Sequence, residues 1–298
     1  MIKLYFFIFF TLFLSYGKSI ENFHPINRCI EHNNTKSIAI REFESSNKNY
    51  YLIVLPNLLK TAIIYKKSTK ITNCNFFTQT KYYKLLKSSI SNSKHPLQND
   101  GITKGDRGLY LTIDLCPSSK RGFEERLYKS VIKSFENPVP VTVFITKRWI
   151  DSHKKELEEL KYWQDSNKLD ITWGNHTAKH IYHPKVPLNK NFVLSKEENL
   201  KRDILDLEIE LIKNSITPSI FFRFPGLVSN KNSLHQVYNL GLITIGSNAW
   251  LAKGELPKIG SIILVHGNKN EPKGVDIFLN LIKNSKIKTL KSLTQIVY

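Results

Sequence analysis

Two histidines stand four residues apart in the stretch Ile-Thr-Trp-Gly-Asn-His-Thr-Ala-Lys-His, residues 171–180. On one turn of a helix, this spacing would place the imidazoles of His176 and His180 on one face, where both could bind the same metal ion. The same spacing also occurs in helices that only expose a polar face. The pair therefore predicts a metal site only in combination with chemistry elsewhere in the chain.

Polar residues also stand at the ends of other apolar runs. Asp114 and His266 each directly follow such a run, and Arg223 lies near the end of a third. Each residue alone could be a cap or a turn residue. Loops at the carboxyl ends of parallel strands meet at one edge of a sheet, however, so these residues and His176 together predict a site at one mouth of the fold.

The elements that would position these residues alternate between strand and helix from residue 107 onward. This rhythm predicts an α/β fold with a mostly parallel sheet, either open or closed into a barrel. The longest helix would begin at a capping box, with Ser195 followed by Glu198. The predicted strands are residues 109–113, 139–145, 169–173, 220–224, 242–245 and 261–265, and the predicted helices are 122–135, 151–164, 195–214, 231–239 and 275–284.

The part of the chain before this region has a different character. Residues 50–55 and 61–65 are β-rich runs on either side of Pro56-Asn57 and predict a hairpin or two adjacent strands, and residues 81–86 predict a short helix. Residues 88–105 are polar and resemble a linker. We therefore expect a small β-containing domain with its linker over residues 18–105, acting as a lid or as a binding module, and a larger domain over residues 106–298.

The first 17 residues have the pattern of a secretory signal peptide. Lys3 is followed by an apolar run over residues 4–14, and the small residues Ser15 and Gly17 stand at cleavage offsets. An uncleaved anchor is the alternative, but the run is short for a membrane span. We expect export to the periplasm or the extracellular space.

The net charge and the cysteines limit the binding partners and the disulfides that we expect. The chain has 44 Lys and Arg against 25 Asp and Glu, a net charge of +19, which predicts attraction to anionic membrane or wall polymers unless it only reflects compositional bias. No arginine-rich run with interleaved aromatics is present, so nucleic acid is not an expected partner. In an oxidising compartment Cys29 and Cys74 could form a disulfide, or both could remain buried thiols.

Five short motifs then occur in the order found in one family. They are Thr112-Ile113-Asp114-Leu115, His176-Thr177-Ala178-Lys179-His180, Arg223-Phe224-Pro225-Gly226, Asn248-Ala249-Trp250 and Leu264-Val265-His266. This stretch resembles the polysaccharide deacetylase family of metal-dependent carbohydrate esterases, also called the NodB-homology domain. The resemblance implies a distorted (β/α) barrel.

The resemblance also implies roles for individual residues. His176 and His180 would bind a divalent metal, zinc first, with cobalt or manganese as alternatives. Asp114 would be the general base and Arg223 would hold it ionised, while His266 would be the general acid. Trp250 would form a wall of the acetyl pocket, and the amide N–H of Gly226 would help to hold the oxyanion.

The expected function is that of an exported hydrolase that removes N-acetyl or related acyl groups from amino sugars of an envelope polysaccharide such as peptidoglycan. The alternative is a catalytically impaired relative that binds glycan in the same cleft. Glycoside hydrolysis fits less well, because it needs two facing carboxylates and Asp114 has no evident partner. The sequence does not specify an oligomeric state.

The chain departs from the family pattern at four positions. Leu115 stands where the family has a second aspartate that ligates the metal, and Cys116 replaces a glycine. Candidates for the third ligand are Asp114, His183 and Cys116, although we expect Cys116 to be a small buried neighbour. The other departures are Gly226 in place of tyrosine and Asn248 in place of aspartate.

Overall fold

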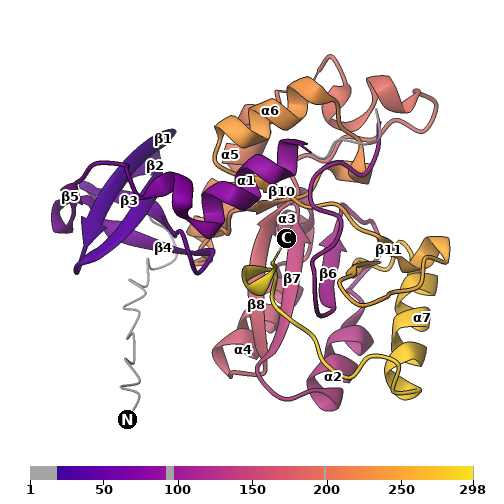
Figure 1. Ribbon diagram of the computed structural model, residues 1–298. Helices are drawn as coiled ribbons and strands as arrows, with labels where there is room; N and C mark the ends of the chain where they lie inside the picture. Colours follow the sequence, from indigo (N-terminus) through magenta and orange to yellow (C-terminus); the bar gives the residue numbers. More distant parts are fainter. Residues whose placement is uncertain (1–18, 92–96, 198, 298) are drawn as a thin grey trace, which may run out of the picture.

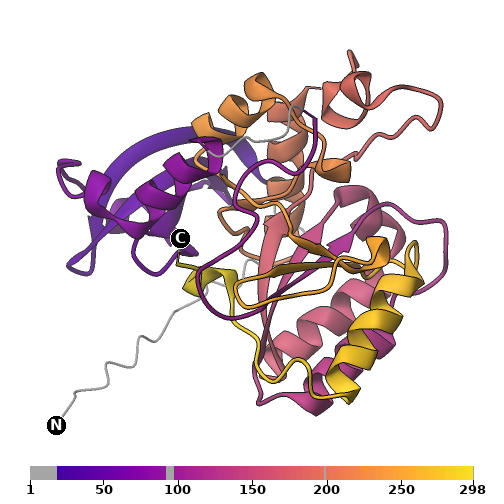
Figure 2. The same ribbon diagram turned by 45° about the vertical axis from the view of Figure 1, so that its right-hand side comes forward.

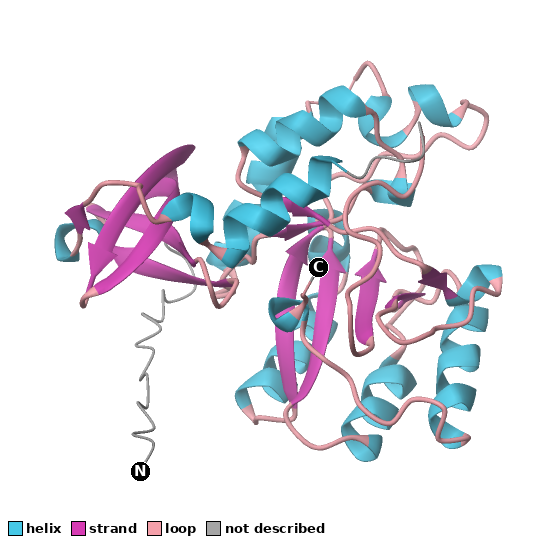
Figure 3. Ribbon diagram, viewed as in Figure 1, coloured by secondary structure: helices cyan, strands magenta, loops and turns pink. Residues whose placement is uncertain are grey.

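The computed structural model describes residues 19–91, 97–197 and 199–297, so the expected signal peptide lies outside the described residues. Its larger part is a seven-stranded parallel sheet covered by helices (Figures 1 and 3). The sheet order is β10-β9-β8-β7-β6-β12-β11. These strands are β6 (Tyr110–Leu115), β7 (Val139–Ile145), β8 (Leu169–Asn175), β9 (Phe221–Phe222), β10 (Ile243–Thr244), β11 (Ala249–Trp250) and β12 (Ile262–His266).

The sheet is an open, curled half-barrel, with β10 and β11 as its edges. Every strand pair in it is parallel, which confirms the distorted barrel predicted from the sequence. Strands β6 to β10 are added in chain order, whereas β12 returns to pair with the free side of β6. In that register Asp114 is directly opposite His266. The return of the chain to the other side of β6 therefore brings two motifs that are distant in the sequence together.

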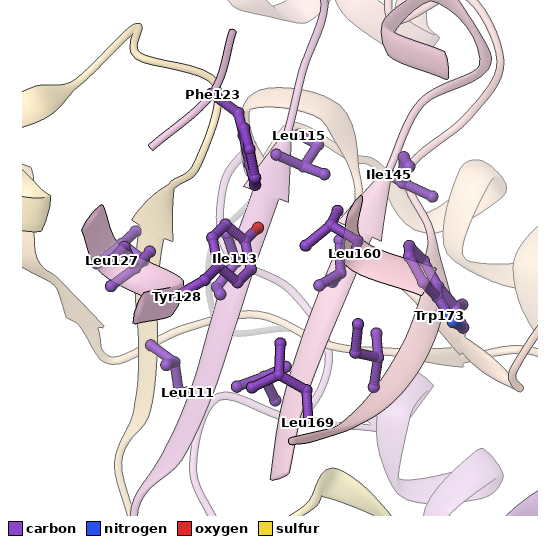
Figure 4. Packing of buried hydrophobic residues seen from close by; sticks show 14 of the residues in the cluster. Leu111, Ile113, Leu115, Phe123, Leu127, Tyr128, Ile145, Leu160, Leu169 and Trp173 are labelled. Atoms are coloured by element: carbon purple, nitrogen blue, oxygen red, sulfur yellow. The ribbon is translucent and has the colours of Figure 1, made fainter. Parts of the chain in front are cut away.

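Side chains of β6 alternate between the two faces of the sheet, as the two-residue period of a strand requires. Leu111, Ile113 and Leu115 pack into the main hydrophobic core (Figure 4). Their partners there include Leu127 of α2 (Glu125–Ser134) and Leu160 of α4 (Lys154–Asp165). The intervening residues of β6 therefore face the other side of the sheet, where the polar groups gather.

Helices α2 and α7 (Pro272–Lys283) lie side by side on the core face of the sheet (Figure 2). The remaining helices of the parallel domain are α3 (Lys147–Ser152), α5 (Leu200–Lys213) and α6 (Lys231–Asn239). Helix α5 begins five residues later than the start predicted at Ser195. Its N-cap is Asn199, whose Oδ1 accepts a hydrogen bond from the amide of Arg202 at 3.1 Å, so the capping-box prediction was wrong.

The N-terminal region forms a five-stranded antiparallel sheet of order β4-β3-β2-β1-β5. The predicted hairpin is present as β3 and β4, whereas the two longest strands were not predicted, since β1 contains Pro25 and its pairing with β2 shifts register twice. Cys29 of β1 is disulfide-bonded to Cys74. The strands are β1 (Glu21–His32), β2 (Thr35–Ser45), β3 (Lys48–Leu55), β4 (Lys60–Tyr65) and β5 (Lys70–Ile71).

A buried ion pair joins this sheet to the parallel domain. Arg41 of β2 forms a two-pronged contact with Glu208 of α5, at 2.6 and 2.8 Å, and also donates to the carbonyl oxygen of Leu240 at 2.7 Å. Both charged side chains are almost completely buried. Since an unpaired charge would be costly there, this contact fixes the sheet against α5.

The stretch predicted as a polar linker, residues 88–105, has regular contacts where it is described, at residues 88–91 and 97–105. Helix α1 spans Lys81–Ser91, and Ile102 forms a parallel bridge with Ile245 beside the edge strand β10. The side chain of Asn99 donates to the carbonyl oxygen of Ser247 and accepts from its amide, at 2.6 and 2.8 Å. In the described part of the chain, no helix is both long and apolar enough to cross a membrane.

Candidate active site

The centre of the site is an ion pair between two buried side chains. Asp114, at the end of β6, is 3% exposed, and Arg223, just past β9, is 0% exposed. An Nη1 atom of Arg223 donates to Oδ1 of Asp114 at 2.7 Å and to Oγ1 of Thr112 at 2.8 Å, and Nη2 donates to the carbonyl oxygen of Gly246 at 2.8 Å. Arg223 thus lies beneath Asp114 and holds it in position.

The two histidines of the 176–180 motif lie in a loop, so the predicted helical turn was wrong. Thr177 and His180 have positive φ angles of 68° and 47°, which an α-helix does not contain. Oγ1 of Thr177 accepts from the amide of His180 at 3.2 Å, and Oδ1 of Asn175 accepts from the amide of Thr177 at 2.9 Å. This loop still places the rings of His176 and His180 with their centroids 4.9 Å apart.

One ring nitrogen of each histidine faces a common point. Nδ1 of His176 lies 2.8 Å from the carbonyl oxygen of Arg223, which leaves Nε2 directed to the site, 3.8 Å from Oδ2 of Asp114 and 3.5 Å from Sγ of Cys116. Nε2 of His180 is buried and has no hydrogen-bond partner among the described residues. A buried nitrogen of this kind is normally satisfied, so it indicates a missing partner.

Donor atoms of Cys116, His176 and His180 all lie within 4.8 Å of one another. A thiolate and two imidazoles are a donor set that zinc accepts. The hydrogen bond from Nδ1 of His176 to the carbonyl oxygen of Arg223 is of the kind that usually orients a metal-binding histidine. The residues present therefore fit the divalent metal implied by the motifs. His183 is exposed and lies outside this group, so it is not a ligand candidate.

The local charges are strongly coupled. Burial opposes ionisation of the Cys116 thiol, but the neighbouring His180, His176 and His266 rings bring its pKa well below the usual value. Burial likewise opposes the charged form of His176, yet the Cys116 and Asp114 groups raise its pKa. The site thus favours a thiolate close to positive charge, the form in which cysteine binds metals.

His266, at the end of β12, is paired with a carboxylate that the sequence did not single out. Its Nδ1 lies 2.8 Å from Oε2 of Glu271, which also accepts a hydrogen bond from Nε1 of Trp250 at 2.9 Å. Burial would lower the pKa of His266, but the Cys116 and Glu271 groups raise it well above the usual value. Asn248, which replaces the family's aspartate, instead has its Oδ1 bound to the amide of Ile262 at 3.0 Å.

The comparison with known families agrees with this arrangement. The family model described as Polysaccharide deacetylase matches residues 101–245. Residues 101–245 belong to the polysaccharide deacetylase family. This polysaccharide deacetylase domain supports carbohydrate N-deacetylase activity, which the ordered motifs predicted. A second family model, described as the RP012 protein N-terminal domain, matches residues 21–91 and so covers the antiparallel sheet and α1 of this deacetylase.

Solved structures similar to this deacetylase include a family 4 carbohydrate esterase from Bacillus anthracis, with 20% identity, a TM-score of 0.49, and coverage of 72% of this chain and 90% of that one. PdaA of Bacillus subtilis, another family 4 carbohydrate esterase, has 18% identity, a TM-score of 0.48, and coverage of 66% and 84%. A chitin deacetylase from Colletotrichum lindemuthianum has 15% identity, a TM-score of 0.48, and coverage of 66% and 90%.

The site of the deacetylase opens into a cavity of about 490 Å³. Of the residues predicted from the sequence, Arg223 lies behind this cavity and the others line it. Gln98 and Glu271 also line the cavity and were not predicted from the sequence. Cys116, which the sequence offered as a candidate third ligand but which we expected to be only a small buried neighbour, lines it as well. The predicted residues in the lining are Asp114, His176, His180, Gly226, Trp250 and His266.

The structure explains why residue 226 is a glycine. Its φ is +61°, and a Cβ atom there would lie 2.6 Å from the Phe192 ring. The tyrosine usual in the family therefore does not fit, and Phe192 contributes the aromatic lining instead. The Nε2 atom of Gln98 donates to the carbonyl oxygen of Gly226 at 3.3 Å. A single sequence carries no signal for Gln98, because only the tertiary course of residues 97–104 brings it to the cavity.

Proposed function

We propose that this protein is an exported, metal-dependent deacetylase that removes N-acetyl groups from amino sugars of an envelope polysaccharide such as peptidoglycan. One observation carries the proposal. Asp114 and His266 are register partners at the ends of adjacent strands, and both line one cavity together with a three-residue donor set. A base, an acid and a metal-binding group are the three requirements of amide hydrolysis by an activated water.

The residues have separable roles in this reaction. A bound divalent ion would supply Lewis-acid polarisation of the acetyl carbonyl and a lower pKa for the attacking water. Asp114, held through Oδ1 by Arg223, accepts the water proton on Oδ2. His266 gives a proton to the sugar nitrogen as the C–N bond breaks, and the products are acetate and a free amine.

The remaining cavity residues bind the substrate. The Trp250 indole forms one wall and is fixed by its hydrogen bond to Glu271. The backbone amide of Gly226 is proposed to donate to the oxyanion. A cavity of about 490 Å³ is of the size that holds a small ligand or one sugar unit with its acetyl group.

The choice of an envelope glycan rests on charge and on the N-terminal pattern. A chain of net charge +19 is attracted to acidic wall polymers, and residues 1–17 have the composition of a signal peptide. Zinc is the proposed ion, with cobalt or manganese as substitutes. Fractionation of cells producing the full chain tests export: recovery of the uncleaved protein in the cytoplasm would refute it.

The second function is binding of glycan without turnover. The observation that favours it is Leu115, whose side chain is buried in the core where the family pattern has an acidic ligand. Elemental mass spectrometry of the purified protein, combined with acetate release from N-acetylglucosamine oligomers and peptidoglycan, separates the two functions. Near-stoichiometric metal with acetate release supports the deacetylase, whereas glycan binding without acetate after addition of zinc or cobalt supports the binder.

A further inference from the structure

The geometry of β6 decides which of its residues can reach the metal-binding histidines. Leu115 is 0% exposed and packs in the main core (Figure 4). Asp114, one residue earlier in the strand, points to the opposite face and lines the cavity. Cys116 directly follows the last residue of β6, and continuing the alternation of the strand by one residue returns it to the Asp114 face. Cys116 lines the cavity, whereas Leu115 does not.

The Cys116 thiol is held in place by its surroundings. Its Sγ lies 3.5 Å from Nε2 of His176 and within 4.8 Å of the donor nitrogen of His180. Asn268 donates to the carbonyl oxygen of Cys116 at 2.9 Å, and the hydroxyl of Thr146 donates to that of Leu115 at 3.0 Å. The backbone is thus fixed on both sides of the thiol, and the residue is only 7% exposed.

We propose that Cys116 is the third protein ligand, so that this deacetylase binds its metal through one thiolate and two imidazoles. The inference rests on the proposed function and specifies its metal site. Three protein ligands leave a fourth, open position for water and substrate, as a catalytic zinc site requires. Asp114 then stays outside the metal shell, bound to Arg223, and remains available as the base.

The ligand set predicts metal preference. Thiolate is a soft ligand that favours zinc and cobalt, whereas manganese and magnesium prefer oxygen ligands. We expect the protein to retain zinc or cobalt during dialysis and to lose manganese. Replacing Cys116 by serine removes the soft donor and should weaken zinc binding by more than about 100-fold, because loss of a direct ligand should cost more than loss of a group that only orients one.

The direct test is the absorption spectrum of the cobalt-loaded protein. A thiolate bound to cobalt(II) gives a charge-transfer band in the near ultraviolet, and this chain allows only one source for it. The sequence has three cysteines, and two of them, Cys29 and Cys74, are joined in the disulfide. We expect the band in the parent protein and its loss in Cys116→Ser and Cys116→Asp.

Cys116→Asp is the informative control, because its carboxylate can still bind cobalt without giving the band. Circular dichroism and thermal melting of both variants establish that they are folded. Stoichiometric cobalt without the band in the parent protein would overturn the inference, while acetate release by the same sample would leave the proposed function intact. Failure to bind zinc or cobalt at all would overturn both.

A second readout uses thiol chemistry instead of spectroscopy. With the disulfide intact, iodoacetamide can modify only Cys116, which borders the cavity. If its sulfur binds the metal, zinc should slow alkylation by at least tenfold, and a chelator should restore the rate. Equal alkylation rates with and without zinc, in a sample shown to contain one zinc per chain, would contradict the inference.

Discussion

Glu271 lies 2.8 Å from His266 and at the same time accepts a hydrogen bond from Trp250 at 2.9 Å. One carboxylate, from the start of α7, thereby orients both the proposed general acid and the wall of the acetyl pocket. Residue 248, which is an aspartate in the family pattern, is an asparagine in this chain, and the carboxylate that pairs with His266 comes from Glu271. Glu271 is consequently a positioning residue for His266.

Replacing Glu271 with glutamine should change the pH dependence of the reaction. The Cys116 and Glu271 groups raise the pKa of His266 against the effect of burial, and the general acid must be protonated to act. Activity is therefore lost as pH rises through the pKa of His266. Without the Glu271 charge that pKa falls, so the alkaline limb of kcat/KM should move to lower pH and kcat should drop about tenfold or more.

The matched control is Asp276→Asn, which removes a charge from the same helix at an exposed ion pair with Arg126. This variant should keep the pH profile of the parent protein. An unchanged alkaline limb in Glu271→Gln, together with normal folding, would show that Glu271 does not act through His266.

Asp114→Asn should retain the metal and lose turnover. The amide keeps the size of the side chain but cannot accept the water proton, and loss of a general base costs roughly 10²–10⁴-fold in rate. His176→Ala and His180→Ala should instead lose the metal. Metal content and acetate release measured on the same samples separate these effects. If Asp114→Asn is the variant that loses its metal, Asp114 is a ligand and not the base.

Leu115→Asp should not restore a carboxylate ligand. The side chain at this position is buried among Ile113, Leu127 and other apolar residues, so a carboxylate would be unpaired in the core. We expect a loss of about 3–5 kcal/mol in the free energy of unfolding, measured with urea. The volume-conserving variant Leu115→Met should cost less than about 1.5 kcal/mol. Tighter metal binding by a stable Leu115→Asp protein would refute the assigned orientation.

The Arg41–Glu208 pair should be a major link between the antiparallel sheet and α5. Arg41→Met leaves the Glu208 carboxylate buried without its partner and should destabilise the protein by about 3–5 kcal/mol. Adding Glu208→Leu should recover much of this loss, because the charge that Arg41 had satisfied is then gone. Urea unfolding of the two single variants and the double variant gives the coupling energy. Additive losses would mean that the ion pair contributes no coupling.

The sequence by itself determined the elements with strong local signals. Strand β7 and helix α6 lie where the apolar pattern predicts them, because period 2 and period 3.6 are properties of neighbouring residues. The order of the five motifs likewise identified the family. Asp114 and His266 could be placed at strand ends, and hence at one edge of the sheet, before the strand order was known.

Only the tertiary structure decided what depends on distant segments. The return of β12 to β6 sets Asp114 opposite His266, and the start of α7 brings in Glu271, which no spacing rule connects to either. Residues 176–180 form a loop and not a helix, because the backbone at Thr177 and His180 is left-handed. Hydrogen bonds from the amides of these two residues to the side chains of Asn175 and Thr177 hold that conformation. Cys116 reaches the histidines because strand pairing fixes the face of Asp114 and Leu115 just before it and Asn268 holds its backbone, and a register cannot be obtained from one strand alone.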